Sequence, residues 1–215
     1  MKVKTALLFA GAQITDYSFY EAQKIKSDIV ICCDSGMHHT KVLGIRPDYI
    51  VGDFDSVNPE VLEEYKREGI EVYQFPAHKD RTDLQIGIAL ALEKGATDLT
   101  ILGGIGSRFD HTLANAHLLY GLLKRGIRAR LVNENNAVQL IDKELIVKKE
   151  SWVYVSLIPL SMKVSGVTLT GFAYPLTDYT LHMDEELLAV SNELIAEEGR
   201  ITITDGYLFV ICSKD

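Results

Sequence analysis

The sequence predicts an α/β plus all-β fold: an N-terminal domain on a mostly parallel sheet, then a small C-terminal antiparallel β-sandwich. From residue 1 to about 135, short apolar runs alternate with helical stretches, as in a parallel sheet covered by helices. After about residue 145, short β-rich runs follow one another between turn residues, as in a sandwich or barrel. The length of 215 residues and the hydrophobic content of 47% are sufficient for a core in each half.

The first half contains the apolar runs that we expect to form the parallel sheet. They cover residues 3–10, 28–33, 49–51, 72–75, 99–104 and 129–133. Helices are expected between them, and three of these helical stretches end at a glycine, a common helix stop: residues 58–69, 82–95 and 109–126. Asn58 and Pro59 form an N-cap followed by a proline at the first helical position.

The N-terminal run "MKVKTALLFAGAQ" has two interpretations. Basic residues before an apolar run are typical of a secretory signal, but this run is at the short end for one. The alternative is a first β-strand from Val3 to Ala10 that breaks at Gly11. We favour the strand because later segments repeat the pattern of a strand followed by a glycine.

The second half consists of segments with the composition of short strands. They cover residues 152–160, 163–171, 179–183, 200–205 and 206–213, and several alternate with a period of two. Residues 136–150 connect the two halves and already resemble strands. We therefore expect one domain over residues 1–135 and a second over residues 136–215.

Charge and cysteine content exclude several classes of protein. The net charge is -8, whereas a nucleic-acid surface is usually basic, so an anionic substrate would need a metal ion as its counter-charge. No apolar stretch approaches the roughly 20 residues that cross a bilayer. Cys32, Cys33 and Cys212 are odd in number and two are adjacent, which argues against a disulfide framework and favours the cytoplasm. We expect no nucleic-acid partner and no membrane partner.

Polar side chains follow four successive strands of the predicted parallel sheet. Ligands bind at the carboxyl ends of the strands in such sheets, so these side chains should gather at one edge. Asp53 and Asp55 are two residues apart in an extended segment and share a face, so they can converge on one cation. The residues after the other strands are Asp34, then Asp80, Thr82 and Asp83, then Arg108 and Asp110.

Each acidic residue has a simpler explanation when it is taken singly. Asp34 fits a turn, Asp83 fits the first turn of a helix, and Asp110 fits a helix N-cap. Asp53 and Asp55 are harder to explain in this way, because two nearby carboxylates raise each other's pKa unless a cation lies between them. Carboxylates with substrate phosphates are the ligands that Mg²⁺ prefers, so their convergence indicates a magnesium site.

Other nucleotide and metal motifs are mostly absent from the sequence. There is no G-x-x-x-x-G-K-[ST] loop, and "GGIGSRF" (residues 103–109) lacks the third glycine of a dinucleotide fingerprint. Its glycines and the helix that follows still offer backbone N–H groups for a phosphate. The histidines lack partners at the spacing of a zinc site.

Five segments together resemble the thiamine pyrophosphokinase family. They are "CDSGM" (33–37), "PDYIVGDFDSV" (47–57), "KDRTDLQIGIAL" (79–90), "GGIGSRFDHTLAN" (103–115) and "VSNEL" (190–194), in the order found in that family. The resemblance covers nearly the whole chain. It implies Mg²⁺-dependent transfer of a pyrophosphoryl group from ATP to thiamine, giving thiamine diphosphate and AMP. It also implies a homodimer whose active sites lie between the α/β domain of one subunit and the β-sandwich of the other.

The same resemblance assigns roles to individual residues. Asp53, Asp55 and Asp83 resemble the metal-site carboxylates and, with Arg108, the catalytic set. The residues that resemble the ATP-binding set are Asp34, Lys79, Asp80, Thr82, Arg108 and Asp110. Ser191 and Asn192 resemble part of the thiamine pocket. Tyr174 and Trp152 are the two candidates for the aromatic side chain that packs on thiamine, and Tyr174 is the one assigned to the pocket.

Two other functions remain open on the residues alone. A metal-dependent phosphohydrolase or nucleotidyltransferase would use the same carboxylates. A non-catalytic nucleotide-binding module would bind ATP without turnover, although it leaves the gathering of so many carboxylates unexplained.

Overall fold

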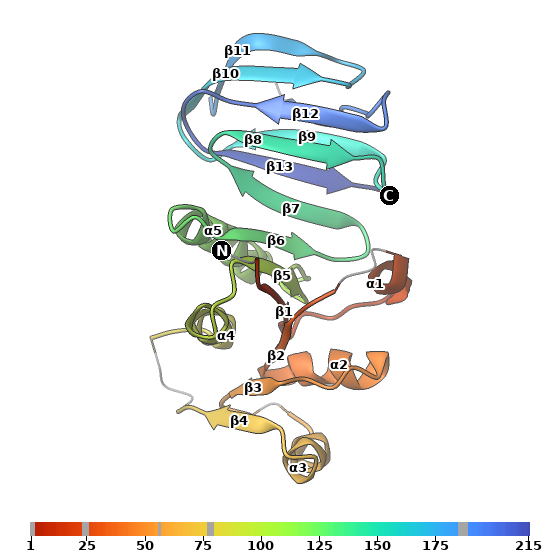
Figure 1. Ribbon diagram of the computed structural model, residues 1–215, viewed down its shortest axis with the longest axis vertical. Coiled ribbons are helices and arrows are strands. Elements are labelled where there is room, and N and C mark those ends of the chain that lie inside the picture. The colour runs from red at the N-terminus through yellow and green to blue at the C-terminus, as the bar shows by residue number, and fades with distance from the viewer. Residues whose placement is uncertain (1–2, 23–25, 56, 77–79, 185–188) are drawn as a thin grey trace. The chain divides into compact units, whose positions relative to one another are not determined.

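Strands and helices alternate along the first part of the chain, as the sequence predicts (Figure 1). The computed structural model describes residues 3–22, 26–55, 57–76, 80–184 and 189–215. By their contacts, the residues divide into two units, Met1–Glu134 and Asn135–Asp215.

The first unit contains six strands and five α-helices among its described residues. The strands are β1 (Thr5–Phe9), β2 (Ile29–Cys33), β3 (Tyr49–Gly52), β4 (Glu71–Gln74), β5 (Asp98–Leu102) and β6 (Arg128–Val132). The helices are α1 (Ser18–Ala22), α2 (Met37–Leu43), α3 (Pro59–Arg67), α4 (Asp83–Glu93) and α5 (Phe109–Leu123), with a short 3₁₀ turn, η1 (Asp34–Gly36), between β2 and α2.

The strand order of this unit creates a switch point in the sheet. The strands lie in the order β4-β3-β2-β1-β5-β6, and the neighbours pair in parallel. The chain builds outward from β1 to β4 and then returns to place β5 on the other side of β1. Right-handed crossovers therefore put α4 and α5 on the face opposite to α2 and α3 (Figure 1). Ligands bind at the carboxyl ends of the strands at such a switch point, here between β1 and β5.

The central strands are apolar along their whole length because helices cover both faces of the sheet. Leu7 and Leu8 of β1, Ile31 of β2 and Ile101 of β5 have no exposed surface. α4 packs on β1, β2 and β3, whereas α2 packs on β1 and β2. This burial explains why these strands read as continuous apolar runs and not as alternating ones.

Helix ends in the first unit follow the signals in the sequence. The Asn58 side chain accepts a hydrogen bond from the Glu60 backbone N–H at 2.9 Å, and Pro59 is the first residue of α3. α5 differs from one of the interpretations above. Its N-cap position is Arg108, which makes no side-chain capping bond, and Asp110 lies in the first helical turn. An N-cap role for Asp110 is therefore wrong.

The regular elements of the second unit, among its described residues, are antiparallel strands. They are β7 (Asn136–Ile141), β8 (Glu144–Lys148), β9 (Tyr154–Pro159), β10 (Lys163–Thr170), β11 (Leu176–His182), β12 (Glu198–Thr202) and β13 (Leu208–Ser213). One group has the order β7-β13-β9 and the other the order β11-β10-β12-β8. Val155 and Leu157 of β9 are buried, as are Val167 of β10 and Ile201 of β12. The predicted fold class, an α/β sheet followed by a β-sandwich, is confirmed.

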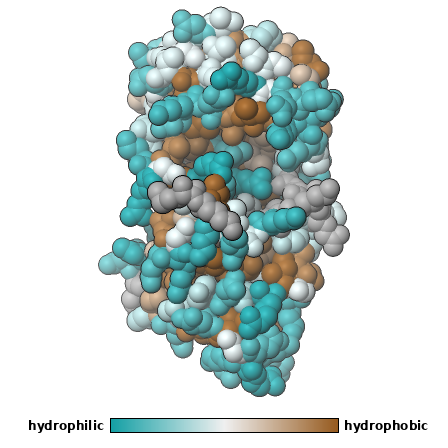
Figure 2. Space-filling model, in the orientation of Figure 1, coloured by the Kyte–Doolittle hydropathy of each residue, from teal (hydrophilic) through white to brown (hydrophobic). Residues whose placement is uncertain are grey.

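The N-terminal apolar run forms a central strand, since β1 pairs with β2 on one side and β5 on the other. No helix in the described part of the chain is long and apolar enough to cross a membrane. The face turned to the viewer in Figure 2 is largely hydrophilic, with hydrophobic residues scattered over both units.

Candidate active site

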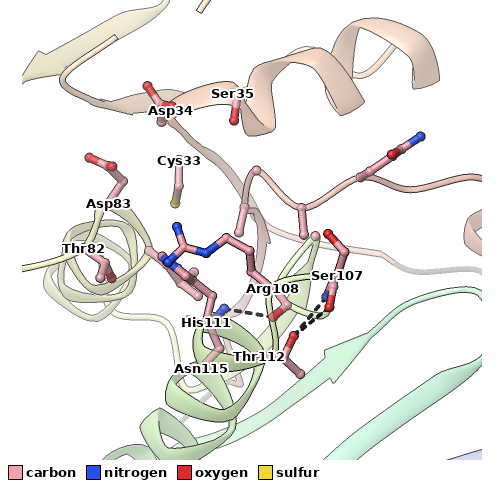
Figure 3. Close-up of a pocket in the computed structure, with 18 residues that line it drawn as sticks. Cys33, Asp34, Ser35, Thr82, Asp83, Ser107, Arg108, His111, Thr112 and Asn115 are labelled. Carbon is pink, nitrogen blue, oxygen red and sulfur yellow. Dashed lines mark hydrogen bonds between the residues drawn. The ribbon is translucent and has the colours of Figure 1, made fainter. Parts of the chain in front are cut away.

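A pocket of about 370 Å³ opens in the first unit at the carboxyl ends of β1, β2 and β5 (Figure 3). It lies at the switch point of the sheet. Four connections contribute to its wall: residues 10–13 after β1, 33–35 after β2, 82–84 at the start of α4, and 103–108 with the first turns of α5.

Glycines bring the loop after β5 close to the loop after β1. Gly103 has a φ of +65°, and a Cβ atom on it would lie 2.1 Å from the Ala10 carbonyl oxygen. Two polar side chains of α5 hold this loop. The Thr112 hydroxyl accepts from the Gly106 N–H and donates to the Gly106 carbonyl, both at 3.1 Å, and the Asn115 amide donates to the Gly104 carbonyl at 2.8 Å. Because Gly103, Gly104 and Gly106 have no side chains, a ligand can approach the backbone of this part of the wall.

The start of α4 forms another part of the wall. The Thr82 hydroxyl accepts from the Gln85 N–H at 3.3 Å, and the Gln85 side chain accepts from the Thr82 N–H at 2.9 Å, which is a complete capping box. Asp83 is the first residue of the helix and also lines the pocket. The positive end of the helix dipole points at this region and favours anionic groups.

Arg108 brings positive charge into the pocket wall. Its guanidinium donates two hydrogen bonds to the Asp110 carboxylate. One runs from Nη2 to Oδ2 at 2.6 Å, and the other from Nε to Oδ1 at 3.3 Å. This pairing lowers the pKa of the Asp110 carboxyl below its usual value. Figure 3 shows the Arg108 side chain extending toward the side of the pocket that α4 forms. Arg108 is one of the residues that line the pocket and Asp110 is not, but the Asp110 carboxylate orients the guanidinium by pairing with it.

The carboxylates after β2 and β3 lie in one neighbourhood. The Phe54 N–H donates to Asp34 at 3.2 Å, and the Asp55 N–H donates to Asp53 at 3.2 Å. Asp34 and Phe54 both have left-handed backbone conformations, with φ of 49° and 63°. The hydrogen bond and charge of Asp53 raise the pKa of Asp55, and the charges of Asp34 and Asp83 act in the same direction.

The structure brings some of the predicted site residues into one pocket and leaves others outside it. Asp34, Thr82, Asp83 and Arg108 line the pocket. Asp80 lines a neighbouring depression beside β4 and α4. Lys79 lies outside the described residues. Within the described ranges, His, Cys, Asp and Glu side chains form no group of three or more that is close enough to hold a metal ion.

The second unit has an apolar pocket of about 240 Å³ between its two groups of strands. Leu157 of β9, Leu169 of β10 and Ile201 of β12 form part of its wall, and Tyr174 and Asn192 line it as well. Ser191 is adjacent to Asn192, has a φ of 57°, and donates its N–H to the Ser156 hydroxyl at 3.0 Å.

Asn192 is buried and its side-chain amide bonds to the backbone around it. The Oδ1 atom accepts from the N–H groups of Tyr174 at 3.0 Å and Glu193 at 2.9 Å, and Nδ2 donates to the Tyr174 carbonyl at 2.7 Å. The Tyr174 side chain itself is 70% exposed. Asn192 therefore holds the chain that carries Tyr174 at the edge of the pocket.

Several wall residues have no role in the sequence-based assignment. Residues 11–13 line the pocket, and their sequence signal is the break of the first strand at Gly11. Thr112 and Asn115 lie in the "GGIGSRFDHTLAN" block, but a polar residue on a helix carries no sign that it will hold a loop. The apolar wall of the second pocket has the sequence pattern of ordinary core strands.

Comparisons with known proteins agree with the two-unit arrangement. A family model described as "Thiamin pyrophosphokinase, catalytic domain" matches residues 20–131, and one described as "Thiamin pyrophosphokinase, vitamin B1 binding domain" matches residues 143–208. The chain is 36% identical over 174 residues to a thiamine pyrophosphokinase of Bacillus subtilis, covering 80% of this chain and 81% of that one. It is 29% identical to thiamine pyrophosphokinase 1 of Oryza sativa subsp. japonica, covering 79% and 67%.

Solved structures of similar proteins share the whole fold. The crystal structure of thiamine pyrophosphokinase from Bacillus subtilis has a TM-score of 0.88 and 34% identity, covering 99% of this chain and 100% of that one. The corresponding protein from Geobacillus thermodenitrificans has a TM-score of 0.83 and 30% identity, covering 100% and 98%.

Proposed function

This chain belongs to the thiamine pyrophosphokinase family, whose members transfer a pyrophosphoryl group from ATP to thiamine, and we propose that the pocket between β1 and β5 is where it binds ATP. The observation that carries this proposal is the meeting of backbone-lined loops, a capped helix N-terminus and Arg108 in one pocket. Each of these features favours phosphate oxygens.

The ATP-binding set that we propose follows the geometry of this pocket. Thr82 caps the N-terminus of α4, and Arg108 offers its planar guanidinium, which Asp110 orients, to phosphate oxygens. Asp34 lines the wall and also holds the Phe54 backbone. Lys79 and Asp80 complete the set that the family resemblance implies.

We propose Mg²⁺ as the metal ion, with Asp53, Asp55 and Asp83 as its protein ligands; these three described carboxylates do not form a ready-made metal site in the structure, so they would have to converge when the ion binds. Carboxylate oxygens are suitable donors for Mg²⁺, and the raised pKa of Asp55 reports repulsion among carboxylates that a cation would relieve. When bound, the ion would neutralise phosphate charge during transfer. It would also offset the repulsion between ATP and a protein with a net charge of -8.

In the reaction, the thiamine hydroxyl oxygen forms a bond to the β-phosphorus of ATP. The bond between that phosphorus and the oxygen bridging to the α-phosphorus breaks, AMP leaves, and the hydroxyl proton is released. The chain's own residues contribute mainly by positioning and charge: Arg108 and the start of α4 hold the phosphates in line with the incoming oxygen. We count Arg108 with the three metal-site aspartates as the catalytic set.

We propose the apolar pocket of the second unit as the thiamine site. Thiamine has flat rings that need an apolar enclosure with a few polar groups, and this pocket combines aliphatic walls with Tyr174 at its edge. Tyr174 is therefore the aromatic candidate that we favour over Trp152. Ser191 and Asn192 shape the edge from the adjoining segment.

We further propose that the protein works as a homodimer in the cytoplasm, with each active site shared between two subunits. The family resemblance supports the dimer, and a two-fold axis would build two equivalent sites. The buried cysteines support a reducing compartment, since Cys32, Cys33 and Cys212 are free thiols.

One assay tests the reaction. The protein is incubated with ATP and Mg²⁺, with and without thiamine, and the nucleotides are separated. AMP formed only in the presence of thiamine is the expected result. ADP, or hydrolysis of ATP without thiamine, would indicate a phosphohydrolase, and Mg²⁺-dependent binding of ATP without turnover would indicate a binding module.

Mixing two inactive variants tests the shared site. Asp53→Asn and Asn192→Ala proteins are mixed under conditions of subunit exchange, at a thiamine concentration where neither parent is active. If the site is shared, each heterodimer has one site with both lesions and one with neither, so part of the activity returns. Confirmed exchange without recovery would overturn the shared site.

A further inference from the structure

His39 is a buried titratable residue with no part in the roles proposed above. It lies in α2 and is only 4% exposed. Its Nε2 atom is 3.0 Å from the Ala12 carbonyl oxygen, and its Nδ1 atom is 2.7 Å from the Tyr17 hydroxyl. The ring thus links Ala12 to Tyr17, and both residues belong to the connection between β1 and α1.

The two contacts determine which ring nitrogen carries the proton. A carbonyl oxygen can only accept, so Nε2 must donate to Ala12. Burial lowers the pKa of His39, against a smaller opposing effect of the hydrogen bond to Ala12, so the neutral form of the ring is favoured. Nδ1 is then an acceptor, and the Tyr17 hydroxyl donates to it. The Ala12 carbonyl therefore sets the Nε2–H tautomer of His39, and Tyr17 supports it by donating to Nδ1.

Ala12 is part of the pocket wall and is held from its other side by the loop after β5. The Ala12 N–H donates to the Gly103 carbonyl at 3.0 Å. A Cβ atom on Gly106 would lie 2.6 Å from the Ala12 Cβ, so that loop packs directly on Ala12. Thr15, in the same connection between β1 and α1, donates its hydroxyl to the Glu134 carboxylate at 2.6 Å. From α2, His39 provides the hydrogen bond to the Ala12 carbonyl.

We propose that His39 is a positioning residue for ATP, whose Nε2–H holds the Ala12 carbonyl and so keeps the backbone of residues 11–13 in place against the phosphates. The proposal rests on the proposed function, because it takes this pocket as the ATP site. It assigns Tyr17 a supporting role, as the hydrogen-bond donor to Nδ1 that helps hold the His39 ring in place.

Substitutions at His39 should affect ATP and leave thiamine unchanged. His39→Ala removes both hydrogen bonds and is expected to raise the KM for ATP about 10-fold, the scale of one lost hydrogen bond, with kcat and the KM for thiamine within about 3-fold of wild type. His39→Gln retains an N–H donor and should bring the KM for ATP back to within about 3-fold.

A matched variant separates positioning from simple loss of stability. Thr40 lies next to His39 in α2 and is buried, and its hydroxyl donates to the Met37 carbonyl at 2.9 Å. Thr40→Val should lower the unfolding temperature without changing the KM for ATP, because Thr40 makes its hydrogen bonds away from the 10–17 connection. His38→Gln changes the exposed neighbouring histidine and should change neither quantity.

Nitrogen NMR of the histidine ring supplies a readout that does not depend on activity. The wild-type protein should show His39 as the Nε2–H tautomer. In Tyr17→Phe the Ala12 carbonyl still accepts from Nε2, so the Nε2–H tautomer should persist, and loss of the hydrogen bond to Nδ1 should raise the KM for ATP by no more than about 3-fold.

An unchanged KM for ATP in His39→Ala would overturn the proposal, as would an equal increase in His39→Ala and Thr40→Val. Observation of the Nδ1–H tautomer in the wild-type protein would also overturn it. All three results leave the proposed function intact if wild-type protein forms AMP only with thiamine. If the wild-type protein does not bind ATP, the proposed function fails and this inference fails with it.

Discussion

The side-chain amide of Asn192 bonds to both backbone polar groups of Tyr174: Nδ2 donates to the carbonyl at 2.7 Å, and Oδ1 accepts from the N–H at 3.0 Å. Asn192 is buried, whereas the ring of Tyr174 is exposed. One buried amide thus determines where the chain presents an aromatic ring at the edge of the apolar pocket.

Asn192→Asp should weaken thiamine binding through Tyr174. The aspartate retains an acceptor for the Tyr174 N–H but loses the donor, so a carboxylate oxygen faces the Tyr174 carbonyl. We expect a loss of about 1–3 kcal/mol in the free energy of unfolding and an increase of about 10-fold in the KM for thiamine. Denaturant titration and steady-state kinetics measure the two effects. Glu193→Gln is the control, because Glu193 is exposed and its backbone N–H keeps the bond to Asn192. An equal increase in the KM for ATP would contradict the assignment.

Asp53→Asn and Asp55→Asn should each lower kcat by about 100-fold or more, because each removes a proposed ligand of Mg²⁺. Neither change should unfold the protein, since Asp55 is exposed and the substitutions relieve repulsion between the two carboxylates. Rates measured against Mg²⁺ concentration, with circular dichroism as the control for folding, test this. Turnover close to wild type at limiting Mg²⁺ in both variants would refute the metal assignment.

Arg108→Lys should raise the KM for ATP about 10-fold although the charge is conserved, because lysine cannot form two parallel hydrogen bonds. Asp110→Asn is the informative companion. It removes the carboxylate that orients Arg108 and should cause a smaller increase than Arg108→Lys. Kinetics with varied ATP at saturating thiamine give both values. A larger effect at Asp110 would reverse the roles of the two residues.

Gly103→Ala should destabilise the first unit more than Gly44→Ala. Both glycines have left-handed conformations, with φ of 65° and 64°, so both substitutions cost about 1–2 kcal/mol for the backbone alone. At Gly103 the new Cβ would also lie 2.1 Å from the Ala10 carbonyl oxygen, whereas at Gly44 no atom lies within 4 Å. Urea unfolding of the two variants isolates the effect of the close contact. Equal losses of stability would show that the loops after β1 and β5 are not held this close.

Stability should fall with acidification through His39. Burial lowers its pKa in the folded protein, whereas the unfolded chain has the ordinary value of about 6.5. Between these two pKa values the unfolded chain binds more protons, so the stability that neutral His39 contributes is complete above about pH 6.5 and is lost as the pH falls toward the folded pKa. Urea unfolding as a function of pH should show a slope in this window that His39→Gln reduces. The same slope in both proteins would assign it to other groups.

The sequence by itself determined the class of each half and the kind of chemistry. Continuous apolar runs between helical stretches can be buried only in a sheet covered on both faces, and short alternating runs suit a sandwich. Local signals such as Asn58–Pro59 and Thr82 with Gln85 depend on neighbours within three residues, so they can be read from the chain. The five ordered segments indicate the family because they are strings of residues, which need no structure to compare.

Only the tertiary structure decided which of these residues meet. No single segment of the sequence specifies the order of the strands in the sheet. Residues 10–13 lie beside residues 103–106 because β5 pairs with β1. Asn192 bonds to Tyr174, 18 residues away, and His39 bonds to Ala12, 27 residues away. Such contacts depend on how the chain crosses the sheet and on the distances that result. Residue type alone does not distinguish a buried histidine that holds a loop from one that only fills space.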